Sequence, residues 1–155
     1  MYGHLTVFLH VLSAFVWVGG MIAIRFAVHP ALASITDPRI KLGKTLEITG
    51  RLFHLVIPFI LTLLITGLMM VLQMDGHKVG NAHRYLFFAK EGIWILMTIN
   101  FVYMYLRRRS AWKLFTEGEL PKAKEQVRHI PNLLLPLNIL LGIMALYLGI
   151  SLRGL

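Results

Sequence analysis

The chain has 155 residues, 57% of them hydrophobic, with 16 Lys and Arg, 7 Asp and Glu, and no cysteine. A mean hydropathy of +0.68 and a charged fraction of 15% exclude a disordered chain and an ordinary soluble basic protein, in which about 25% of residues are charged. The lack of cysteine excludes disulfides, thiolate metal sites and thiol catalysis. The length predicts a single domain, and the hydropathy places that domain in a membrane.

Three apolar segments are long enough to cross a bilayer without any charged residue. Leu5–Ile24, Leu52–Leu72 and Ile130–Leu152 are uncharged over 20, 21 and 23 residues. An α-helix rises about 1.5 Å per residue, so about 20 residues cover the roughly 30 Å hydrocarbon core. The first segment lacks the basic start and the small-residue cleavage site of a signal peptide, and we therefore expect a retained helix.

The remaining apolar segment is shorter and brings charge into the membrane. Gly92–Leu106 is uncharged for only 15 residues, so a spanning helix must begin near Tyr85. This extension takes Lys90 and Glu91 into the bilayer or just beneath its surface. Ionisable groups are costly there and are candidates for function.

These spans predict an all-α, transmembrane up-down four-helix bundle, because short connections favour antiparallel neighbours. A single membrane domain is expected over residues 1–155. Its helices are predicted at about 4–28, 50–73, 83–109 and 129–152, with a basic helical arm at about 110–128. The arm is amphipathic from Trp112 to Val127, with breaks expected at Gly118 and Pro121.

The distribution of Lys and Arg predicts the orientation. Twelve lie on or beside the connections that follow the first and third spans, and four lie on the opposite side. Positive loops stay in the cytoplasm, so we expect a multi-pass protein of the inner (cytoplasmic) membrane with both termini on the non-cytoplasmic side. The basic charge then reflects topology and attraction to lipid headgroups, and nucleic acid is not expected as a partner.

With this orientation, the polar residues of the spans fall into two layers. The outer layer holds His10, His83, Lys90 and Glu91, and the inner layer holds three histidines with two nearby arginines: His29, His54, His129, Arg25 and Arg51. Histidines supply axial ligands to haem, aromatic residues such as Trp17 wall the ring, and cations neutralise its propionates. The plainer interpretation is that helix-end histidines anchor at the headgroups and that Lys90 extends to the interface.

The first span also resembles a known family. His10 is followed seven residues later by Trp17 and then by Gly19-Gly20, the first-helix pattern of copper-resistance D (CopD-like) membrane domains. The stretch from Arg84 to Lys90 is similar to the opening of that family's third helix. The architecture also resembles the HemJ-like protoporphyrinogen oxidases. Four residues of this chain can be matched to the pattern of that family: His10, Arg25, Lys90 and, with a one-residue offset, His29. The HemJ-like Asn-Glu-hydrophobic-Pro-Thr run is replaced here by Arg128-His129-Ile130-Pro131-Asn132, which lacks the acidic residue.

Three hypotheses follow from these residues and this resemblance. The first is a b-type haem redox protein that transfers electrons or acts on a quinone or porphyrinogen, with one or two haems. His10 and His83 would ligate the first haem, with Lys90 as a propionate contact or alternative ligand. His54 and His129 would ligate the second haem, with His29 as a substitute ligand. The second is copper handling by His10, His83 and membrane methionines. The third is a cofactor-free accessory subunit of a larger membrane complex. A redox partner protein and a homo-oligomer remain open.

Overall fold

The computed structural model describes residues 2–72 and 81–152, and the side chains of 3–72 and 84–152. Within these ranges all regular structure is helical. Four helical stretches are long and apolar enough to cross a membrane: Gly3–Leu32, Pro38–Leu72, Arg84–Thr116 and Leu120–Ser151. The predicted four-span helical bundle is thereby confirmed, and the chain has the character of a multi-pass membrane protein.

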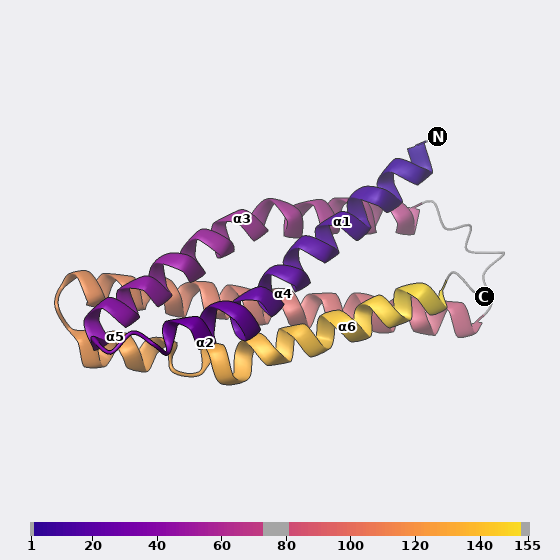
Figure 1. Cartoon of the computed structure of the whole chain (residues 1–155). Coiled ribbons are helices and arrows are strands. Elements are labelled where there is room, and N and C mark those ends of the chain that lie inside the picture. The colour runs from indigo at the N-terminus through magenta and orange to yellow at the C-terminus, as the bar shows by residue number, and fades with distance from the viewer. Residues whose placement is uncertain (1, 73–80, 153–155) are drawn as a thin grey trace.

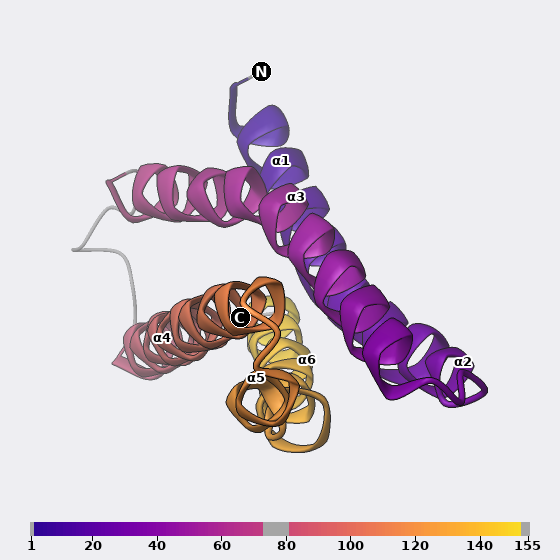
Figure 2. The ribbon, with the colours of Figure 1, turned by 90° about the vertical axis from the view of Figure 1, so that its left-hand side faces the viewer.

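The helices form two groups that run side by side (Figures 1 and 2). α1 packs most extensively on α3, and α4 packs on α5 and α6. Both described chain ends lie at one end of the bundle, here called the terminal end, and α2 and α5 lie at the other, called the arm end (Figure 1). The elements are α1 (Tyr2–Ala23), η1 (Ile24–Val28), α2 (His29–Leu32), α3 (Pro38–Leu72), α4 (Asn81–Thr116), α5 (Leu120–Val127), η2 (Ile130–Leu134) and α6 (Leu135–Ser151).

Two helices extend beyond their predicted bounds at the arm end. α3 begins at Pro38 rather than near residue 50, because Asp37 caps its start by accepting hydrogen bonds from the backbone N–H groups of Arg39 (2.8 Å) and Ile40 (3.1 Å). α4 continues to Thr116 and so includes the first part of the predicted arm. The chain breaks at Gly118, whose φ of 85° suits glycine, whereas the expected break at Pro121 is instead the first turn of α5.

Two π-helical turns, η1 and η2, interrupt the membrane helices at the arm end. The His29 N–H donates to the carbonyl of Ile24, and the Leu134 N–H donates to the carbonyl of His129 at 3.1 Å. A proline follows each turn closely, Pro30 after η1 and Pro136 after η2. Proline has no N–H to donate to the carbonyl four residues back, so the hydrogen-bond register shifts there.

The centre of the bundle is filled by large apolar side chains. Trp17 is 1% exposed and meets the edge of Phe101 at 6.0 Å between ring centroids, and Phe53 meets Phe101 at 5.1 Å. Gly142 permits close packing of α6 on α1, because a Cβ at that position would clash with Val18. The mid-bundle core is therefore apolar and closely packed.

A pair of asparagines joins α4 to α6 within this core. Asn100 Nδ2 donates to Asn138 Oδ1 at 2.7 Å and to the carbonyl of Leu134 at 2.8 Å. Asn138, which is fully buried, donates to the carbonyl of Met97 at 3.1 Å. Amides in an apolar interior must be satisfied by protein groups, so this pair fixes how the two helices pack.

We predict that the two asparagines are energetically coupled. Asn100→Leu and Asn138→Leu should each lower the free energy of unfolding by about 1–2 kcal/mol. The double variant should lose about 0.5–1 kcal/mol less than the two single losses together, because the shared hydrogen bond is removed only once. Reversible unfolding in mixed micelles measures all three values, and strictly additive losses would contradict the coupling.

Candidate functional site

His10 docks on α3 through a hydrogen bond inside the terminal half of the bundle. Its Nδ1 lies 2.9 Å from the hydroxyl oxygen of Thr66, which is buried. The Thr66 hydroxyl donates its only hydrogen within α3, to the carbonyl of Thr62 at 2.7 Å, with that of Leu63 also near at 3.2 Å. Toward His10 the hydroxyl must therefore accept, so Nδ1 carries the proton and Nε2 of the neutral ring carries the lone pair.

His54 has the same tautomer for a related reason. Its Nδ1 lies 2.7 Å from the carbonyl oxygen of Gly50, one turn earlier in α3, and a carbonyl can only accept. Its ring also meets Tyr105 of α4 at 5.8 Å between centroids. The lone pair of this imidazole is therefore also on Nε2.

The other predicted outer-layer residues lie on α4. Lys90, whose side chain is 17% exposed, has its Nζ 3.8 Å from Glu91 Oε1, and its Cε lies beside Gly149 of α6. His83 belongs to α4, but its side chain lies outside the described residues. His10 of α1 thus contacts α3, whereas Lys90 of α4 contacts α6.

The predicted inner-layer residues are dispersed at the arm end. His129 is exposed at the start of η2, and the Arg25 guanidinium lies over the neighbouring Phe26 ring at 5.7 Å. Trp17 belongs to the packed core, and its Nε1 finds no acceptor in the part of the chain that is described. Across the described side chains, no three His, Asp or Glu residues are grouped to hold a metal ion.

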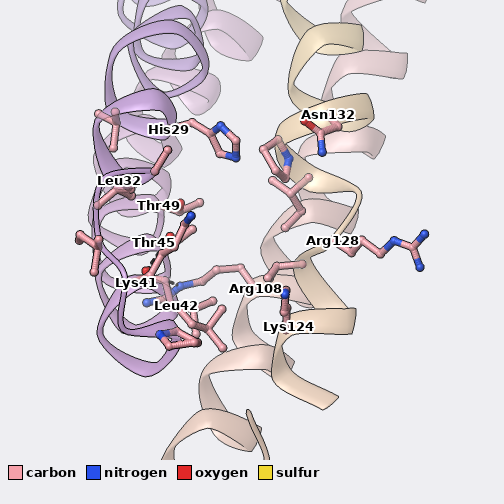
Figure 3. Close-up of a pocket in the computed structure, with 18 of the residues that line it drawn as sticks. His29, Leu32, Lys41, Leu42, Thr45, Thr49, Arg108, Lys124, Arg128 and Asn132 are labelled. Carbon is pink, nitrogen blue, oxygen red and sulfur yellow. Dashed lines mark hydrogen bonds between the residues drawn. The ribbon is translucent and has the colours of Figure 1, made fainter. Parts of the chain in front are cut away.

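His29 is one of the residues that line a cavity in the described part of the chain. This cavity, of about 970 Å³, lies at the arm end between η1, α2 and the start of α3 on one side and α5, η2 and the start of α6 on the other (Figure 3). His29 projects into the space between these walls. Apolar residues make up much of the lining, including Ile24, Leu32, Leu42, Leu46, Ile130 and Leu135.

Arg108 reaches across this cavity from α4 to α3 (Figure 3). Its Nε donates to the carbonyl of Leu46 at 2.9 Å, and its Cζ lies 5.2 Å from the centroid of the Trp112 ring. The guanidinium occupies the space beside Gly50 that a Cβ would fill. The hydrogen bond, the ring and the glycine together hold the charged group in one place.

The cavity lining carries more positive than negative charge. Lys41 and Lys124 line it with Arg108, and Glu125 is the acidic residue among the lining residues. Glu125 pairs with Arg128 at 3.5 Å, and the Arg128 side chain points away from the cavity (Figure 3). The remaining cations therefore have no negative counterpart in the lining.

Sequence patterns missed two of these features. Thr66 was not identified as the partner of His10, although an intramembrane histidine needs one and a threonine at similar depth is a suitable acceptor. Arg108 was assigned only to topology, because its acceptor, Leu46, lies in the first part of α3, before the predicted start of that helix near residue 50. No protein-family model, curated protein or solved structure matches the chain.

Gly50→Ala is predicted to disturb the Arg108 contact. The new methyl group would overlap the guanidinium, so Arg108 must move away and lose its hydrogen bond to the Leu46 carbonyl, which should lower the free energy of unfolding by about 1–3 kcal/mol. Gly92→Ala is the matched control, since a Cβ there meets nothing within 4 Å and the change should be neutral or stabilising. Thermal unfolding in detergent compares the two variants, and equal stability would contradict the placement of Arg108.

Proposed function

We propose that this chain is an integral membrane b-type haem-binding redox protein in which Nε2 of His10 is an axial ligand. One observation carries the proposal: the hydrogen bond from His10 Nδ1 to the Thr66 hydroxyl. Histidines that bind metals almost always donate the other ring N–H to a protein acceptor, which fixes the tautomer and orients the ring. His10 has this arrangement on a helix apolar enough to span a membrane.

The chemistry of the surrounding residues fits a haem. An imidazole with its lone pair on Nε2 is a common axial donor, and apolar membrane helices shield a porphyrin from water. When bound, a haem would supply one-electron transfer. The chain's own residues would bind and orient it, with Thr66 holding the His10 ring.

The remaining roles follow the resemblance to CopD-like and HemJ-like proteins and are part of the proposal. His83, whose side chain lies outside the described residues, would be the second ligand to the haem, and Lys90 would be a propionate contact or alternative ligand. His54, which also has its lone pair on Nε2, would ligate a second haem with His129 or His29. Arg25 would neutralise a propionate.

The proposed orientation places His10 toward the outer face of the inner membrane. The concentration of Lys and Arg at the arm end supports a cytoplasmic location for that end. Electrons would then pass between an external donor or a membrane quinone and a partner protein.

His10→Ala should remove the haem, whereas His4→Ala should retain it. His4 is an exposed histidine on the same helix and is the matched control. Pyridine haemochrome assays on the purified full-length chain measure haem per polypeptide. Equal haem in both variants would overturn His10 ligation. Stoichiometric copper that disappears in His10→Ala, with no haem in the wild type, would replace the proposal with copper handling.

Thr66→Val tests the hydrogen bond itself while keeping the shape of the side chain. Loss of the acceptor should weaken haem affinity about 10- to 100-fold and raise the midpoint potential, because the imidazole becomes a weaker donor. Thr62→Val is the control, since that hydroxyl donates to the Pro58 carbonyl of its own helix at 2.9 Å and does not contact His10. Haem-transfer kinetics and redox titration provide the readouts, and indistinguishable Thr66 and Thr62 variants would contradict the assigned role.

A further inference from the structure

We propose that the arm-end cavity binds an anionic phospholipid, with its phosphate group held by Arg108. This inference goes beyond haem binding and concerns the opposite end of the bundle from His10. It rests on the position of Arg108, the excess of positive charge around it and the apolar walls beside it.

Arg108 is prepared to receive an anion. Its Nε–H is used by the Leu46 carbonyl, and in the described part of the chain no carboxylate lies within ion-pair distance of the guanidinium. Among the described residues no group accepts a hydrogen bond from the terminal nitrogens, so their N–H groups can bind a ligand. A planar guanidinium donates two parallel hydrogen bonds to phosphate oxygens, a geometry that a lysine cannot provide.

The neighbouring cations extend this site. Lys41 approaches from α3 and Lys124 from α5 (Figure 3). His29, which projects from the junction of η1 and α2, adds a polar ring to the lining and is not counted among these cations. Glu125 does not offset them, since it is paired with Arg128. A single negative headgroup would therefore be favoured from both walls of the cavity, and a zwitterionic headgroup would bring its own cation against them.

The walls favour a lipid over a small soluble anion. Ile24 and Leu32 on one side and Ile130 and Leu135 on the other form apolar surfaces suited to acyl chains. At about 970 Å³ the cavity is far larger than a bare phosphate needs. It lies where the candidate membrane-spanning helices meet their connections, and helix ends of this kind are expected near the headgroups.

The π-helical turns shape both sides of this space. Ile24 and Val28 of η1 and Ile130, Pro131 and Asn132 of η2 contribute to the lining. Single π turns occur often at functional sites because the extra residue per turn redirects side chains. Both turns therefore direct side chains into the lining of the same cavity.

Native mass spectrometry of the delipidated, full-length chain tests the proposal. Phosphatidylglycerol should bind about tenfold more tightly than phosphatidylcholine with the same acyl chains, and glycerol 3-phosphate should not bind at the same concentrations. Equal affinity for the two lipids would overturn the assignment. Binding of glycerol 3-phosphate as tight as that of phosphatidylglycerol would overturn the lipid in favour of a soluble phosphate.

Matched variants locate the site. Arg108→Gln should weaken phosphatidylglycerol binding about tenfold, whereas Arg109→Gln, which removes the same charge from an exposed neighbour, should leave it unchanged. Lys124→Gln, at an exposed position of α5, should weaken binding about threefold and serves if Arg108→Gln does not fold. Equal affinities of the Arg108 and Arg109 variants for phosphatidylglycerol would overturn the site. If Arg108→Gln does not fold, unchanged binding in Lys124→Gln would overturn it.

The haem spectrum of Arg108→Gln should match the wild type, because Arg108 lies at the other end of the bundle from His10. Failure of lipid binding with an intact haem spectrum would overturn only the cavity proposal. A wild-type chain without haem that still prefers phosphatidylglycerol would overturn only the haem proposal.

Discussion

A polar side chain placed among lipid tails must find its partner inside the protein, because the hydrocarbon offers none. This constraint explains the contacts that organise the bundle. Thr66 bonds its own helix and accepts from His10, and Asn138 bonds both Asn100 and the backbone of α4. Each contact joins two helices and fixes their relative position, which apolar packing alone would leave less well defined. The hydrogen bond that satisfies His10 also determines which of its nitrogens can bind a metal.

The two ends of the bundle meet this constraint in different ways. Near the terminal end, the His10 imidazole is hydrogen-bonded to a hydroxyl on a neighbouring helix. At the arm end, the charged Arg108 is held by a carbonyl, an aromatic face and the absence of a side chain at Gly50. The first arrangement suits a neutral donor to a cofactor, and the second suits a cation that receives an anionic ligand. The packed core around Trp17 separates them.

Hydropathy and length were sufficient to predict four helical spans, because about 20 apolar residues are a strong signal. The start of α3 was misplaced, since Pro38 to Gly50 is too polar to suggest a membrane helix and its stability comes from the Asp37 cap and packing. The depth of His10 predicted that it needs a partner, but periodicity could not identify Thr66 on another helix. The predicted grouping of inner-layer histidines depended on helix rotations, and the structure places His29 in a cavity while His54 bonds its own helix.

We propose that the arrangement around His10 holds a haem. The reduced-minus-oxidised visible spectrum of the purified wild-type chain, expressed with haem supplementation, tests this most directly. We expect the Soret and α bands of a six-coordinate b-type haem at one or two equivalents per chain. A featureless spectrum under these conditions would contradict it.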